Sequence, residues 1–232
     1  MKIAVINHSG NVGKTTISKM LVAHLKAAYL AVESINAEDP AKAVRGREFI
    51  DIHDALHMTE KSVIVDVGSS NVEDFTLAMS EFYGSHEMFD LFIVPASPGG
   101  KQIADTIATI ENLAGMGAPA GRISVVFNML ERGDEPRRIF SELFEHQANK
   151  QNFTICDAAV IRKNELFTLM REMKIKKSIA DLAADGTDYK GMIAAAGDQD
   201  EKLRLTRMIA IKRLAQSVTH QVDIIFRDLH IN

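Results

Sequence analysis

The chain has 232 residues, of which 46% are hydrophobic and 25% are charged, so it can bury the core of one large domain or of a domain with an appendage. Its single cysteine, Cys156, excludes an intrachain disulfide, and no apolar run approaches the roughly 18 residues that cross a bilayer. The net charge of −4 argues against a protein that coats nucleic acid through overall charge, and we expect a cytoplasmic protein.

Strand and helix patterns alternate along the first part of the chain. A short β-branched run at 2–7 is followed over 15–28 by apolar residues at helical spacing. Further continuous apolar runs predict strands covered on both faces, at 28–36, 62–68, 90–97 and 122–128. Amphipathic segments separate these runs. The alternation predicts an α/β fold, a doubly wound and mostly parallel sheet with helices on both faces.

The last third of the chain has different patterns. Residues 153–160 predict one more strand, whereas 180–200 are rich in Gly, Asp and Ala without sharp periodicity, so we expect a loop-rich stretch there. From 201 to 229, apolar residues recur at spacings of three and four, which is a heptad pattern. Packing on the chain's own core and pairing with another chain both satisfy it. We expect a core at 1–165 and a helical C-terminal extension at 166–232, together forming one domain.

The stretch NHSGNVGKTT at 7–16 lies between the first predicted strand and the first predicted helix. A phosphate-binding loop has the pattern Gly, four residues, then Gly-Lys-Ser/Thr; Gly13, Lys14 and Thr15 fit it, and His8 occupies the first Gly position. In such a loop the backbone amides point at phosphate oxygens, the lysine bridges the β- and γ-phosphates, and the threonine hydroxyl ligates Mg²⁺. The alternative is a Gly-rich turn that joins a strand to a helix and binds no ligand.

An acidic residue, Asp66, ends the predicted strand VIVDVG. In this position a carboxylate can hold Mg²⁺ through a water, opposite the loop hydroxyl. The alternative is an aspartate that caps the helix starting near Asn71. The small residues Gly68, Ser69 and Ser70 follow it and suit a loop that senses a γ-phosphate.

This ordered set of motifs resembles the ParA/MinD family of deviant Walker-A ATPases, which are P-loop NTPases whose loop reads KGGVGKTT. The stretch SGNVGKTT agrees with it at Gly10, Val12, Gly13, Lys14, Thr15 and Thr16. The Asp39-Pro40 pair and Asp66 add further matches, and the resemblance covers roughly residues 1–165. Within the family, the sequence is most similar to the StbB-type plasmid stability proteins, a branch that works beside a DNA-binding partner in plasmid maintenance and conjugation.

The resemblance implies an ATPase that takes ATP or ADP with Mg²⁺. Lys14, Asp39 and Asp66 are implied to be catalytic, with Asp39 polarising the attacking water. Thr15 is implied to bind Mg²⁺ directly and Asp66 through a water, whereas Asn128 would read adenine. The full set implied to bind the nucleotide is Ser9, Gly10, Asn11, Val12, Gly13, Lys14, Thr15, Thr16 and Asn128.

Three positions depart from the family pattern. Ser9 stands where the signature lysine would reach the partner's phosphates across the dimer, Asn11 replaces the second glycine, and Ala37 replaces the first aspartate of Asp-x-Asp-Pro. Loss of a trans cation costs about 10³-fold or more in related phosphoryl-transfer systems, so we expect slow hydrolysis. The nearby candidates to replace this cation are Lys42, Arg45 and Arg47.

The implied partners are a second copy of the chain, in an ATP-dependent homodimer aided by the C-terminal helix, and a DNA-binding partner protein of the same plasmid system. Residues 162–213 hold 12 Lys or Arg against 8 Asp or Glu. Direct contact with DNA or a membrane surface, and so association with the nucleoid or inner membrane, therefore stays open. Two other functions use the same loop: an ATP-dependent metabolic ligase or synthetase, and a non-hydrolysing nucleotide-binding scaffold.

Two other groups of residues are interpreted as structural. His53 and His57 stand four residues apart and could share a helix face, but with no third ligand at a suitable spacing we interpret them as surface histidines. Cys156 has no histidine at motif spacing, so we expect a small buried apolar group.

Overall fold

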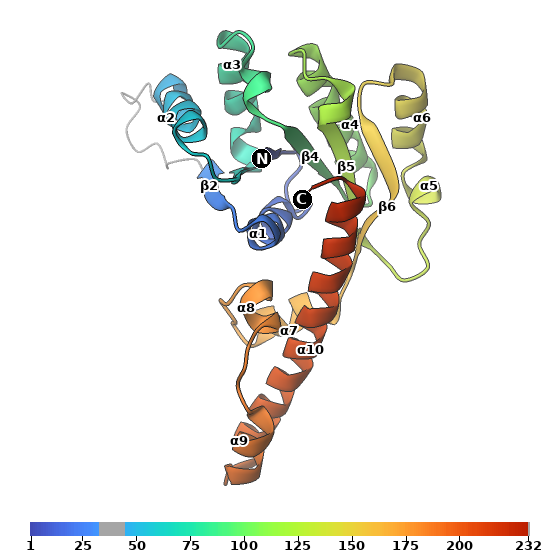
Figure 1. The fold of residues 1–232 in the computed structure, drawn as a ribbon. Coiled ribbons are helices and arrows are strands. Elements are labelled where there is room, and N and C mark those ends of the chain that lie inside the picture. The colour runs from blue at the N-terminus through green and yellow to red at the C-terminus, as the bar shows by residue number, and fades with distance from the viewer. Residues whose placement is uncertain (33–44, 232) are drawn as a thin grey trace. The chain divides into compact units, whose positions relative to one another are not determined.

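The computed structural model describes residues 1–32 and 45–231, with side chains from Phe49 onward in the second range (Figure 1). Its centre is a six-stranded sheet in the order β2-β3-β1-β4-β5-β6, and every recorded strand pair is parallel. The strands are β1 (Lys2–Val5), β2 (Ala28–Val32), β3 (Val63–Val67), β4 (Leu91–Ala96), β5 (Ile123–Leu130) and β6 (Thr154–Arg162). The predicted α/β class and the parallel sheet are confirmed.

Helices connect successive strands, and α7 to α10 follow the last strand. They are α1 (Lys14–Leu25), α2 (Arg45–Met58), α3 (Val72–Glu81), α4 (Gly100–Gly115), α5 (Pro136–Ile139), α6 (Ser141–Lys150), α7 (Glu165–Glu172), α8 (Ile179–Ala183), α9 (Tyr189–Ala195) and α10 (Gln199–Asp228). Short 3₁₀ turns are η1 (Ser69–Asn71), η2 (Ser85–Met88) and η3 (Ala120–Arg122). Because parallel crossovers are right-handed, α2, α3, α4 and α6 lie on one face of the sheet and α1 lies on the other (Figure 1).

The inner strands form the core because both of their faces are covered. All residues of β3 and β4 are buried, and aromatic rings such as Phe89, Phe92 and Phe127 pack between the sheet and its helices. The edge strand β2 differs from the prediction that every strand is covered on both faces. Of its five residues only Val32 is buried, which is consistent with a strand that pairs with a neighbour on one side alone.

The chain divides into two compact units, one formed by residues 1–162 with 226–232 and the other by 163–225. In the first unit, the C-terminal segment lies against α1: the ring of Phe226 packs edge-on against His24, and the His24 Nε2 is 3.1 Å from the Ile231 carbonyl oxygen. The second unit is helical. None of the described helices has the length and apolar character needed to span a bilayer.

Residues 180–200, expected to be loop-rich, instead contain α8, α9 and the start of α10. Polar side chains explain why these helices begin: Ser178 and Asp181 form a capping box on α8, and the Asp188 carboxylate accepts from the Gly191 amide at the start of α9.

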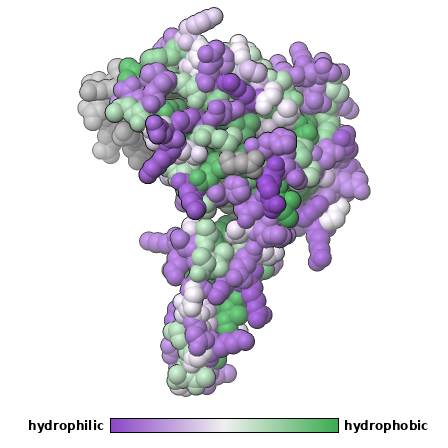
Figure 2. Space-filling view, viewed as in Figure 1, coloured by the Kyte–Doolittle hydropathy of each residue, from purple (hydrophilic) through white to green (hydrophobic). Residues whose placement is uncertain are grey.

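Heptad positions of α10 are buried within the chain, namely Ile211, Ala215, Val218, Val222 and Ile225. The visible face in Figure 2 is mainly hydrophilic with scattered apolar side chains.

Candidate functional site

The stretch 8–15 forms a loop at the carboxyl end of β1, in the middle of the sheet. β1 pairs with β3 on one side and β4 on the other, with Val5 level with both Asp66 and Ile93. Because all strands run parallel, the loops that follow β1, β3 and β4 meet at the same edge. This edge is where doubly wound sheets bind their ligands.

Two residues in the loop adopt positive φ angles, Asn11 at 58° and Gly13 at 93°. Asparagine is among the few residues that tolerate this left-handed region, which explains why Asn11 can replace a glycine. His8 has no positive φ, so the first glycine of the general pattern is not required by the backbone here. Gly13 is the N-cap residue of α1, and no side chain there accepts a hydrogen bond from the helix. The first amides of α1 also lack acceptors within the helix. The loop therefore presents donors and the positive end of a helix dipole to an anion.

The loop entrance is held by α4. The Asn7 side-chain amide donates to the Pro95 carbonyl and to the Thr106 hydroxyl, both at 2.8 Å. The His8 backbone amide and its Nδ1 both contact the Thr109 hydroxyl, at 3.1 and 2.8 Å. Burial lowers the pKa of His8, so its ring adds no charge to the loop near neutral pH. Side chains of α4 thus fix where the loop starts.

Ser9 is buried, with 2% of its surface exposed. Its amide donates to Asn7 Oδ1 at 2.7 Å. Its side chain faces Asp105 of α4, whose pKa is held low first by Lys101 and also by the Ser9 hydroxyl. A short side chain directed into its own subunit cannot supply a charge to a second copy of the chain.

The Lys14 amine lies inside the loop. It donates to the carbonyl oxygens of Asn7 at 2.9 Å and Ser9 at 2.7 Å, and the side chain is buried. Burial lowers the pKa of Lys14 to about 8, although the nearby Asp66 carboxylate opposes the shift. Among the described residues its hydrogen-bond partners are two neutral carbonyls, so this buried ammonium is well placed to gain an anionic ligand.

Asn128, at the end of β5, braces the loop from the other side. Its side-chain amide donates to the Val12 carbonyl at 2.8 Å. A Cβ added to Gly13 would lie 2.1 Å from the same amide nitrogen. The next residue, Met129, has φ 62°, and the β5–β6 register shifts between Asn128 and Leu130. Such an irregularity changes the direction of a side chain, and here Asn128 faces the loop at 8–15.

Asp66 is buried at the end of β3, beside the loop. Its Oδ2 accepts a hydrogen bond from the Tyr29 hydroxyl at 2.8 Å. Its Oδ1 is buried without a hydrogen-bond partner among the described residues. An orphaned carboxylate oxygen near the N-terminus of α1, where Thr15 is the second residue, fits a water of a Mg²⁺ ion, which prefers carboxylates and keeps several waters.

Several expected site residues therefore lie around one loop. Gly10, Asn11 and Thr15 are exposed, Thr16 is half-buried, and the Ser69 hydroxyl of η1 lies 3.6 Å from where a Gly10 Cβ would be. Asp39, Pro40, Ala37 and Lys42 fall outside the described residues, as do the side chains of Arg45 and Arg47. Sequence reasoning missed Asn7, Tyr29, Thr106 and Thr109, because contacts between distant segments leave no local pattern.

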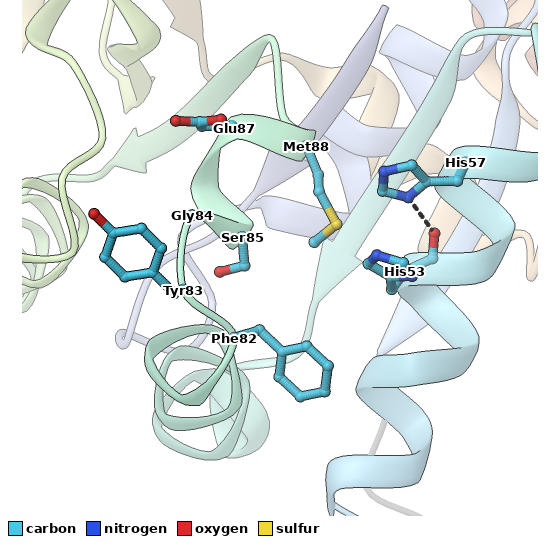
Figure 3. A pocket seen from close by; sticks show the side chains of 8 residues that line it. All are labelled: His53, His57, Phe82, Tyr83, Gly84, Ser85, Glu87 and Met88. Carbon is cyan, nitrogen blue, oxygen red and sulfur yellow. Dashed lines mark hydrogen bonds between the residues drawn. The ribbon is translucent and has the colours of Figure 1, made fainter.

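A separate hollow of about 460 Å³ lies between α2 and η2 (Figure 3). The rings of His53 and His57 lie on its wall with their centroids 4.2 Å apart and their planes tilted by 31°, and Phe82 and Met88 lie on the facing side. His57 Nδ1 bonds the His53 carbonyl, and His53 Nδ1 bonds Asp54. Among the described residues there is no cluster of three or more His, Cys, Asp or Glu that could hold a metal.

Comparison with known proteins gives likeness at the level of structure. No protein-family model matches the chain, and no curated protein matches it. The structure of the ParA protein of pnob8 has a TM-score of 0.50 at 11% identity and covers 98% of each chain. The MinC:MinD cell division complex of Aquifex aeolicus has a TM-score of 0.50 at 12% identity, over 97% of this chain and 95% of that one. A putative plasmid partition protein from Borrelia burgdorferi bound to AMPPNP has a TM-score of 0.45 at 12% identity, over 90% and 96%.

At these identities the likeness concerns the fold. The chain has a P-loop NTPase fold, with an all-parallel six-stranded sheet, surrounding helices and a helical C-terminal region, and solved structures of ParA and MinD are among its structural neighbours.

Proposed function

We propose that the protein is an ATPase of the ParA/MinD kind that binds ATP with Mg²⁺ at residues 9–16. One observation supports this most directly. The Lys14 amine lies within the loop at a helix N-terminus, and the orphaned oxygen of Asp66 lies on the adjacent strand. A turn that only joined a strand to a helix would need neither the buried cation nor the unpaired carboxylate oxygen.

Each described residue has a role that follows from its position, whereas the role of Asp39, outside the described residues, comes from the family resemblance alone. Lys14 exchanges its carbonyl partners for the β- and γ-phosphates, and the amides of the loop and of the first turn of α1 bind the phosphate oxygens. Thr15 and Asp66 would hold Mg²⁺, the latter through a water, and the bound ion would neutralise charge on the phosphates. Asp39 polarises the attacking water. Asn128 keeps the adenine-reading role that the family suggests and in addition supports the Val12 carbonyl.

Hydrolysis is proposed to be slow. With Ser9 buried against its own α4, no cation enters from that position across a dimer. Under this proposal ATP mainly drives dimerisation, and the dimer changes affinity for a DNA-binding partner protein in plasmid stability, segregation or conjugative transfer, as in the StbB-type branch. The buried serine also favours the second candidate, a non-hydrolysing scaffold. Steady hydrolysis in the wild type that disappears in Asp39→Ala would exclude the scaffold.

The experiment that tests the proposal measures both nucleotide binding and the oligomeric state of the protein. Purified protein is titrated with ATP and Mg²⁺ by calorimetry and then sized by light scattering with ADP and with a non-hydrolysable ATP analogue. We expect micromolar or tighter binding and a change from monomer to dimer with the analogue alone. No measurable nucleotide binding at millimolar concentration would refute the ATPase, and binding without a change in mass would refute the dimerisation switch.

The affinity for ADP is expected to fall at alkaline pH. Only the ammonium form of Lys14 pairs with phosphate, and in the free protein burial lowers the pKa of Lys14 to about 8. Bound phosphate raises that pKa, so the free protein loses above pH 8 a proton that the complex retains. Below pH 8 the titration of Lys14 should not change the Kd for ADP. Above pH 8 that Kd should rise about tenfold for each further pH unit. Calorimetry from pH 7 to 10 measures this; a flat Kd to pH 9.5 would contradict it.

A further inference from the structure

The carboxylate of Asp66 is supported by a residue of the edge strand. β2 pairs with β3 in parallel, with Ala31 level with Asp66, and Tyr29 lies two residues earlier on β2. From there the Tyr29 hydroxyl donates to Asp66 Oδ2 at 2.8 Å, although the residue as a whole is 40% exposed. A partly exposed side chain on the edge strand thus contacts a buried carboxylate beside the phosphate loop.

The two oxygens of Asp66 are used differently. Oδ2 accepts from Tyr29, whereas Oδ1 is buried and has no hydrogen-bond partner among the described residues. A carboxylate with one anchored oxygen is restricted in rotation about its terminal torsion, so the direction of the second oxygen is restricted too. Hydrogen bonds of this type, made to a metal-binding group from outside the metal's own ligands, orient that group.

A second tyrosine–aspartate contact in the chain shows what a structural role looks like. The Tyr189 hydroxyl donates to Asp185 Oδ2, also at 2.8 Å. Asp185 also accepts from the Thr187 amide and hydroxyl and pairs with Lys177, so both of its oxygens have partners. For Asp66, by contrast, the tyrosine is the one hydrogen-bond donor recorded in the described chain, and it leaves one oxygen open.

We propose that Tyr29 is a positioning residue for the Mg²⁺ site: its hydroxyl orients the Asp66 carboxylate so that Oδ1 can accept from a metal-bound water. The inference rests on the proposed function, because it assigns Tyr29 to the metal half of the same nucleotide site. It predicts that Tyr29 governs how strongly Mg²⁺ assists nucleotide binding and leaves metal-free binding by the loop unchanged.

The test measures binding without turnover. ADP affinity is determined by calorimetry in EDTA and over a Mg²⁺ titration, for wild type, Tyr29→Phe and Asp66→Asn. We expect the same Kd in EDTA for wild type and Tyr29→Phe, with the apparent Mg²⁺ affinity weakened roughly 10-fold in Tyr29→Phe, the usual size of such an effect. Tyr189→Phe, which loses a tyrosine–aspartate bond of equal length in the other unit, should match the wild type in both measurements.

A double variant separates positioning from general damage. If Tyr29 acts through Asp66, then adding Tyr29→Phe to Asp66→Asn changes the Mg²⁺ dependence by less than about twofold, because the two effects are not additive. An unchanged Mg²⁺ dependence in Tyr29→Phe, or an equal loss of ADP affinity in EDTA, overturns the inference. Wild-type protein that binds no ADP under any condition would instead refute the proposed function itself, and thermal melting verifies that each variant is folded.

Discussion

Replacing Lys14 by methionine is expected to weaken nucleotide binding strongly while leaving the nucleotide-free protein more stable. The Lys14 amine is the buried cation of the phosphate loop. Its charge-assisted bonds to phosphate should contribute about 3 kcal/mol, so the Kd for ATP with Mg²⁺ should rise on the order of 100-fold or more. Calorimetry of the variant beside the wild type measures this effect.

The gain in stability follows from the sign of the pKa shift. Burial lowers the pKa of Lys14 from 10.5 in the unfolded chain to about 8 in the folded one. Keeping the amine charged therefore costs the fold about 3 kcal/mol at pH 7, a cost that disappears as pH rises from 8 towards 10.5. Lys14→Met removes this cost but also loses two hydrogen bonds to carbonyls, which contribute about 1 kcal/mol each. The free energy of unfolding of the variant should therefore be about 1 kcal/mol larger than that of the wild type. Urea denaturation reads the change.

The matched control is Lys19→Met, an exposed lysine on the same helix. It removes a charge of the same sign without touching the loop, and both nucleotide affinity and urea midpoint should stay near the wild-type values. If Lys14→Met and Lys19→Met bind ATP equally well, Lys14 does not face a phosphate.

Gly13→Ala is expected to cause the second large loss, through crowding inside the loop. Gly13 has φ 93°, and a Cβ there would lie 2.1 Å from the Asn128 amide nitrogen. Alanine must therefore adopt an unfavourable φ and displace the side chain that holds the Val12 carbonyl. We expect about 3 kcal/mol of lost stability and a nucleotide affinity at least tenfold weaker, read by urea denaturation and calorimetry.

Gly133 provides the control that isolates the backbone term. Its φ is 96°, and an added Cβ would meet nothing within 4 Å. Gly133→Ala should therefore cost only the backbone term, about 1 kcal/mol, and leave nucleotide binding intact. Combining Gly13→Ala with Asn128→Ala should recover part of the lost stability because the clash is removed. Equal effects of Gly13→Ala and Gly133→Ala would show that Asn128 does not press on the loop.

Much of the fold could be predicted from the sequence because its signals are local. Continuous apolar runs predict β1, β3, β4 and β5, and their alternation with amphipathic segments predicts the parallel sheet. The spacing of Gly13, Lys14 and Thr15 predicts a loop between β1 and α1, and the structure has one there. The expected strand at 153–160 is confirmed as β6, Thr154–Arg162.

What could not be predicted depends on segments that meet only after folding. Tyr29 reaches Asp66 across 37 positions and Thr109 reaches His8 across 101, so neither contact has a local pattern. The positive φ of Met129 depends on the β5–β6 pairing. Over 180–200, composition indicated loops, whereas single side chains such as Asp188 were enough to begin short helices.

The central position of β1 also affects how the protein is made. The loop at 8–15 is synthesised before the segments that support it, because β3 and β4 on either side, Thr106 and Thr109 on α4, and Asn128 at the end of β5 all follow it in the chain. Since a strand between two later partners cannot pair before they exist, nascent chains that end before about residue 130 should be unable to bind a nucleotide. Under the proposed function, ATP can then bind and stabilise the chain only after nearly the whole sheet has been translated.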